Sequence, residues 1–220
     1  MAFLLAPRGP TSLNIVSGRA RTNMGGILLG AALLAMTLSP LSVRAQSRFS
    51  TASPNPAHAL AGKALIDALR SGKLVIYFRH AAIEVTGTGQ ENCRGTTLSE
   101  QGRNEAKLIA EQFSRLKIPV GKVLSSPSCR TKDHARISFG DFEAVEFVFG
   151  EQNNFDKLAD RLTAEHDFKG NLVIVGHISG MKSIAGSPLL EYSEAALIRP
   201  GKDAAIVARL KIGDWATLQD

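Results

Sequence analysis

Hydrophobic residues follow two patterns along this chain: short continuous runs, and longer stretches in which they recur every three or four positions. Leu74–Phe78 and Leu172–Val175 are continuous apolar runs, which are typical of central strands covered by helices on both faces. Shorter runs predict four more strands, and helical spacing predicts four helices. These strands are expected at Val123–Ser125, Val145–Phe149, Ala195–Ile198 and Ala204–Leu210, and the helices at Ala61–Arg70, 99–116, 126–137 and 155–162.

Strands and helices alternate along the chain, and this alternation predicts an α/β fold, a three-layer α/β/α sandwich around a mainly parallel sheet. Residues 59–220 contain no repeat and no second linker, so we expect one domain there. In sheets of this kind, ligands bind beyond the carboxyl ends of the strands. Polar residues that directly follow the strands are therefore the candidates for a functional site.

The first 45 residues have the pattern of a secretory signal peptide. Three arginines precede an apolar stretch at Met24–Val43, and small residues lead up to Ala45, as at sites that signal peptidase cleaves. We expect cleavage after Ala45, a periplasmic or secreted protein, and no stable membrane insertion afterwards. The alternative is a retained anchor, which glycines and Pro40 disfavour because a spanning helix needs about 20 mostly apolar residues. Residues 46–58 are polar with two prolines and predict a flexible segment.

Composition narrows the possible partners. Hydrophobic residues make up 44% of the chain and charged residues 21%, as in globular proteins. The net charge of +6 includes four arginines in residues 1–45, which contain no acidic residue; without them, 22 basic and 20 acidic residues leave +2. Only 6% of residues are aromatic. Both values argue against a nucleic-acid partner.

Three polar clusters follow predicted strands. Arg79-His80 follows the first, Ser125-Ser126-Pro127 with Arg130 follows the second, and Gly176-His177 follows the run at Leu172–Val175. Guanidinium groups bind phosphate through a planar fork, and an imidazole nitrogen can act as a nucleophile. We expect Ser126 to cap the next helix, with Pro127 in its first position. The clusters together predict a phosphoryl-transfer site.

Each of these residues also has a purely structural interpretation. His80 and His177 could be core histidines, and Arg130 could be a surface residue of its helix. Their joint position after strands favours function. His134 and His166 lack this context, and we expect them at the surface.

Four elements together resemble the histidine phosphatase (phosphoglycerate mutase-like) superfamily, in particular its small exported bacterial members. Arg79-His80-Ala81 resembles the Arg-His-Gly signature, and Leu98-Ser99-Glu100-Gln101-Gly102 with Ala106 resembles the family's L-S/T-x-x-G-x-x-x-A helix start. Ser125-Ser126-Pro127 with Arg130 resembles the family's S-S-P-x-x-R turn, and Val175-Gly176-His177 resembles its second histidine. The elements occur in the family's order between about Leu74 and Leu210.

The resemblance implies roles for individual residues. His80 would be the residue that becomes phosphorylated, Arg79 and Arg130 would bind phosphate, and His177 would be the second histidine, hydrogen-bonded to the phosphoryl oxygens. It implies no metal and no organic cofactor. The expected function is an exported phosphomonoesterase with a phosphohistidine intermediate, acting on a phosphorylated small molecule, glycan or phosphoprotein. A non-catalytic phosphate-binding module and a phosphomutase are the alternatives.

The sequence departs from the family pattern in two ways. Ala81 replaces the usual glycine, which a negative backbone φ would tolerate. The general acid has no clear position: Glu91, Glu151 and Glu194 are candidates, and Glu151 is the first choice because the family acid commonly follows the third strand. Each of the three could equally be a solvated surface carboxylate.

Two cysteines flank the predicted site. Cys93 and Cys129 are the only cysteines of the chain, and in an exported protein an even number fits a disulfide. Two independent buried thiols are the alternative. Arg94, beside Cys93, is a candidate substrate-loop residue or a plain loop arginine. The sequence leaves the oligomeric state open.

Overall fold

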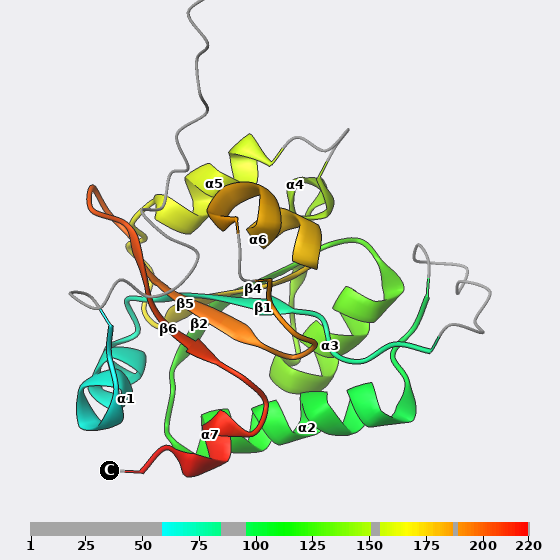
Figure 1. Cartoon of the computed structure of the whole chain (residues 1–220), viewed down its shortest axis with the longest axis horizontal. Helices are drawn as coiled ribbons and strands as arrows, with labels where there is room; N and C mark the ends of the chain where they lie inside the picture. The colour runs from blue at the N-terminus through cyan, green and yellow to red at the C-terminus, as the bar shows by residue number, and fades with distance from the viewer. Residues whose placement is uncertain (1–58, 85–95, 151–154, 187–188, 220) are drawn as a thin grey trace, which may run out of the picture. The chain divides into compact units, whose positions relative to one another are not determined.

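The computed structural model describes residues 59–84, 96–150, 155–186 and 189–219. They belong to one compact unit, Arg44–Asp220, built around a six-stranded sheet with the order β3-β2-β4-β1-β5-β6 (Figure 1). The strands are β1 (Val75–Arg79), β2 (Val120–Ser125), β3 (Glu143–Ala144), β4 (Asn171–Gly176), β5 (Ala195–Arg199) and β6 (Ala205–Leu210). The helices are α1 (Gly62–Ser71), α2 (Glu100–Arg115), α3 (Cys129–Phe139), α4 (Glu146–Phe149), α5 (Asp156–Thr163), α6 (Ile178–Ala185) and α7 (Asp214–Thr217).

The sheet is mixed but mostly parallel. β1, β2, β3 and β4 pair in parallel, whereas β5 pairs antiparallel with β1 and with β6. β2, β4 and β1 are neighbours, so their carboxyl ends meet at one edge of the sheet. This adjacency brings the three predicted polar clusters together.

The sheet separates two hydrophobic cores, because successive residues of a strand point to opposite faces. Ile76 and Phe78 of β1 pack with α1, α2, α3 and α7, whereas Val75 and Tyr77 pack with α4, α5 and α6. Figure 1 shows the same division, with α4, α5 and α6 on one face and α2, α3 and α7 on the other. The predicted α/β/α sandwich is confirmed.

The predicted strand at Val145–Phe149 is wrong, because Glu146–Phe149 forms helix α4. The strand ends early because its neighbour ends: the Val145 N–H donates to the carbonyl of Ser125, the last residue of β2. A short apolar run cannot distinguish a strand from a buried helical turn by its hydrophobicity alone. Val148 lies in this helical turn, and its side chain is completely buried.

Helix boundaries were predicted with mixed success. Ser99 caps α2 as expected, since its side chain accepts a hydrogen bond from the Gly102 N–H at 3.1 Å. α3 begins at Cys129 with Ser128 as its N-cap residue, so the predicted cap at Ser126 is wrong by two residues. Within the described ranges, no helix combines the length and hydrophobicity needed to cross a bilayer.

Candidate functional site

Three segments converge where β1, β4 and β2 end. His80 follows β1, His177 follows β4, and Arg130 lies in the first turn of α3, which follows β2. The backbone ties them together: the His80 N–H donates to the Gly176 carbonyl at 3.0 Å, and the Ser126 N–H donates to the Val175 carbonyl at 3.1 Å. The site is therefore fixed to the rigid centre of the sheet.

Arg130 lies between the two imidazoles. Its Nε donates to Nε2 of His80 at 3.1 Å, and its Nη2 donates to Nδ1 of His177 at 3.2 Å. The two ring centroids are 5.4 Å apart. A guanidinium carries only donors, so both ring nitrogens that face Arg130 must be unprotonated acceptors.

The remaining ring nitrogens carry the protons. Nδ1 of His80 donates to the Ala81 carbonyl at 2.9 Å, which leaves the Nε2 lone pair of His80 free of a proton. Nε2 of His177 donates to the Ser126 hydroxyl at 2.8 Å. This bond explains why Ser126 does not cap α3, since its Oγ is engaged by His177 and by the Ser128 N–H. Both histidines are thus neutral, each in one defined tautomer.

Burial and neighbouring charge keep both imidazoles neutral. Each histidine is 6% exposed. Burial, above all, lowers the pKa of His80 to about 4, and the charges of Arg130 and Arg79 act in the same direction. Burial also lowers the pKa of His177 to about 3, again aided by Arg130. Two guanidinium groups and two neutral imidazoles make a cationic cluster suited to an anion.

Arg79 lies beside this cluster, and part of its guanidinium group is used in structural contacts. Its Nη1 donates to the Leu190 carbonyl at 2.9 Å, and its guanidinium carbon stands 3.8 Å from the centre of the Tyr192 ring. Its Nε is buried and makes no hydrogen bond. The positive charge of Arg79 acts on both His80 and His177.

His134 is not at the surface, contrary to the expectation from the sequence. It is completely buried in α3, and its Nδ1 accepts a hydrogen bond from the Ala81 N–H at 3.1 Å. Burial lowers its pKa to about 3. The residue anchors the backbone just after His80. Only its i+4 spacing from Arg130, which gives it nearly the same direction along the helix, could have indicated this role.

Two carboxylates near the site are already engaged. Glu194, predicted as a candidate acid, is 2% exposed and pairs with Arg209 at 2.7 Å, while its second oxygen accepts from the Glu191 N–H. Glu105, which the sequence did not single out, accepts from the Ala82 N–H at 3.2 Å and from the Ser193 hydroxyl at 2.6 Å. Through these hydrogen bonds, both carboxylates hold the loops around His80 in place.

Four predicted site residues remain without a structural description. Glu91, Arg94, Glu151 and Cys93 lie outside the described residues. Cys129 is completely buried at the start of α3, next to Arg130. The pairing of the two cysteines stays a prediction. Among the residues described, no group of three or more His, Cys, Asp or Glu side chains could hold a metal ion.

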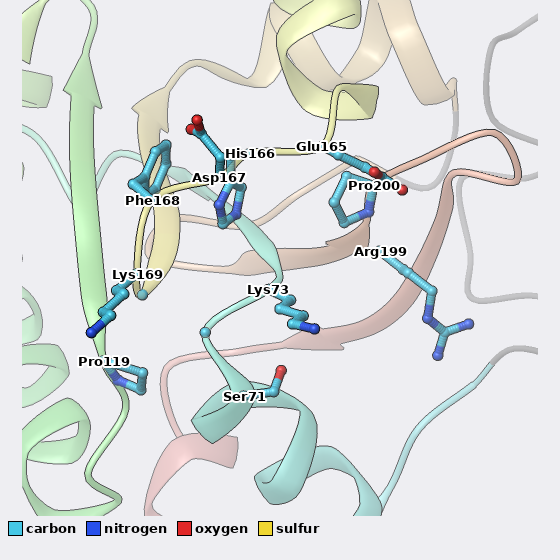
Figure 2. Close-up of a pocket in the computed structure, with 12 residues that line it drawn as sticks. Ser71, Lys73, Pro119, Glu165, His166, Asp167, Phe168, Lys169, Arg199 and Pro200 are labelled. Carbon is cyan, nitrogen blue, oxygen red and sulfur yellow. The ribbon is translucent and has the colours of Figure 1, made fainter.

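A hollow lies at the end of the sheet away from His80 and His177, and Figure 2 shows the side chains that line it. It is a cavity of about 740 Å³ between the starts of β1, β2 and β4 and the end of β5. Its charged side chains have both signs, and His166 stacks on Phe168 with ring centroids 4.2 Å apart. It lies away from the carboxyl ends of the parallel strands, where His80 and His177 stand. The charged side chains that line it are Lys73, Lys169, Arg199, Glu165 and Asp167.

Comparison with known proteins gives a match over the segment that contains His80 and Arg130. Residues 75–148 match the model of the histidine phosphatase superfamily (branch 1), and this segment contains three of the four motifs but not Val175-Gly176-His177. None of the curated proteins matches the chain. The chain is similar to the protein histidine phosphatase SixA, solved with tungstate, with 14% identity over 64% of this chain and 97% of that one and a TM-score of 0.49. It is similar to a mutant phosphoserine phosphatase from Entamoeba histolytica with phosphoserine, with 15% identity over 63% and 97% and a TM-score of 0.46.

Proposed function

We propose that this chain, whose residues 75–148 match the histidine phosphatase superfamily (branch 1), is a phosphomonoesterase that forms a phosphohistidine on His80. The observation that carries the proposal is the state of the His80 ring. Its Nε2 is unprotonated, is held next to the Arg130 guanidinium, and lies opposite a proton-bearing Nδ1 fixed by the Ala81 carbonyl. A neutral imidazole with a fixed tautomer can attack phosphorus without first losing a proton.

In the first step, Nε2 of His80 attacks the phosphorus atom and the bond from phosphorus to the ester oxygen breaks; the ester oxygen keeps the bonding electrons, takes up a proton from solvent and leaves as the alcohol. Arg130 turns its two N–H groups from the imidazoles to the phosphoryl oxygens, where a planar fork fits best. The Nδ1–H of the phosphorylated ring stays bound to the Ala81 carbonyl, which stabilises the positive charge that the ring acquires.

His177 changes its protonation when phosphate binds. A dianion beside the ring raises the pKa of His177, so its Nδ1 acquires a proton. The Nδ1–H then donates a hydrogen bond to a phosphoryl oxygen. In the second step, a water oxygen attacks phosphorus, the N–P bond breaks, and His80 and inorganic phosphate are released. Positioning and charge supply most of the catalysis in such transfers.

Turnover of p-nitrophenyl phosphate tests the proposal directly. We expect the purified protein to release p-nitrophenol and phosphate, and His80→Ala to reduce release to background. His166→Ala, in the hollow at the other end of the sheet, is the matched control and should retain activity. Protein quenched in alkali during turnover should carry the mass of one phosphoryl group, which acid removes.

Two other outcomes would replace this proposal by an alternative. Binding of inorganic phosphate without any turnover would make the chain a non-catalytic phosphate-binding module. Transfer of the phosphoryl group between two hydroxyls without net release would make it a phosphomutase.

We also propose that the chain is exported and that Cys93 bonds to Cys129. The proposal rests on the signal-peptide pattern of residues 1–45 and on the even number of cysteines. Sequencing the N-terminus of protein recovered from the periplasm or medium should give Gln46. The protein mass should rise by two hydrogens on reduction, whereas an unchanged mass would show two free thiols.

A further inference from the structure

Four aromatic rings stand in a row across the site. Tyr192 lies against His80, with ring centroids 5.5 Å apart, and His80 lies 5.4 Å from His177. Phe149 at the end of α4 meets His177 edge-on, at 5.4 Å and 90°. The two imidazoles that would handle the phosphoryl group are therefore flanked by hydrocarbon rings on both sides.

The two outer rings are partly open to solvent. Phe149 is 36% exposed and Tyr192 is 38% exposed. Across the described ranges, only four large apolar side chains are exposed; the other two are Val120 and Leu189. Exposed apolar surface beside a polar site commonly receives the apolar part of a ligand.

An aryl ester also suits the chemistry of the site, because its leaving oxygen needs no proton from the protein. Glu105 and Glu194, two described carboxylates near the site, are held by other partners, and Glu91 and Glu151 lie outside the described residues. An alkyl ester needs a proton donor for its leaving oxygen. A phenol ionises with a pKa of about 10, so its oxygen can leave as the anion.

We propose that Phe149 and Tyr192 make the site selective for aryl phosphomonoesters, in which the phosphoryl group is attached to the oxygen of an aromatic ring. This inference rests on the proposed phosphatase function. His80 Nε2 forms the bond to phosphorus, the aryl oxygen takes the bonding electrons and leaves as a phenolate, and water then releases phosphate. The phenolate takes up a proton from solvent, so one water is consumed for each phenol and phosphate formed.

The test is the ratio of kcat/KM for phenyl phosphate to kcat/KM for glycerol 3-phosphate. Comparing this ratio between variants removes the intrinsic difference between the two leaving groups. We expect Phe149→Ala to lower the ratio about three- to tenfold, the loss of one aromatic contact, and Phe149→Leu to lower it less. Val120→Ala, which removes an equally exposed apolar side chain at the far end of β2, should leave it unchanged.

A phosphotyrosyl peptide and phenyl phosphate carry the same aryl phosphate and are assayed side by side. A greater kcat/KM for the peptide would point to a protein substrate, and a greater value for phenyl phosphate to a small molecule. If the wild-type protein hydrolyses both ester types and Phe149→Ala leaves the ratio unchanged, the selectivity proposal is wrong and the phosphatase function stands. If the wild type forms no phosphoenzyme with any ester, the function itself fails.

Discussion

The hydroxyl of Tyr77 accepts a hydrogen bond from the His177 N–H at 2.9 Å and donates one to the carbonyl of the same residue at 2.8 Å. The side chain reaches the turn between β4 and α6 from the neighbouring strand β1, and it is completely buried. Gly176 leaves room for the hydroxyl, since a Cβ there would lie 2.2 Å from it. Tyr77 thus positions His177 through its backbone, and burial raises the pKa of its phenol so that it stays protonated.

Tyr77→Phe should weaken both stability and turnover. Without the hydroxyl, the N–H and carbonyl of His177 lose a buried partner, which costs about 1–3 kcal/mol of unfolding free energy. A displaced His177 should lower kcat more than it raises KM. Urea unfolding and steady-state kinetics measure the two effects. Tyr192→Phe removes an exposed hydroxyl and should stay within about 0.5 kcal/mol of wild type; equal stability of both variants would contradict the role of Tyr77.

Gly102→Ala should displace the loop that follows His80. A Cβ at Gly102 would lie 2.0 Å from the Ala82 carbonyl oxygen, which accepts a hydrogen bond from the Ser99 N–H. The loop must move or the start of α2 must unwind, and we expect a loss of about 1–3 kcal/mol together with lower turnover. Gly213→Ala is the matched control, because no atom lies within 4 Å of its Cβ position and its φ is −72°. A Gly102→Ala protein as stable and active as the control would show that the loop adapts freely.

Arg130→Ala should remove most of the phosphate affinity and of the catalysis. The guanidinium donates a hydrogen bond to each of the two imidazoles. We expect kcat/KM for p-nitrophenyl phosphate to fall about 10²–10³-fold, as when one preorganised donor to the transition state is removed. Arg130→Lys should recover only part of this loss, because lysine lacks the planar fork. Arg136→Ala, two turns along α3 and exposed, should behave as wild type.

The sequence predicted the fold and the convergence of the site because both depend on the order of strands and on the residues that follow them. Leu74–Phe78 and Leu172–Val175 are continuous apolar runs, which are typical of central strands that helices cover on both faces. His80, Arg130 and His177 follow strand ends, so the topology brings them together.

The errors concern residues whose environment is set by distant parts of the chain. The burial of His134 depends on the packing of α3 against β1, which its local sequence does not show. Ser126 is a good N-cap residue in isolation, but His177, 51 positions away, takes its hydroxyl. Glu105 has no local signature either, because its partners Ala82 and Ser193 come from two separate loops.

The three buried histidines should make the protein sensitive to mild acid. Burial lowers the pKa values of His80, His177 and His134 to about 4, 3 and 3, against about 6.5 in the unfolded chain. Between these values the unfolded chain binds more protons than the native protein, so the unfolding free energy rises with pH up to about 6.5 and is lost as the pH falls below it. Each histidine contributes a slope of up to about 1.4 kcal/mol per pH unit.

Urea unfolding at pH 7.5, 6 and 5 measures this slope of unfolding free energy against pH. His134→Gln should reduce the slope by about the contribution of one histidine. Inorganic phosphate, which favours protonated His177, should reduce it further in the wild type. A slope unaffected by His134→Gln would mean that this ring is protonated in the native protein, and its hydrogen bond from Ala81 would then be impossible.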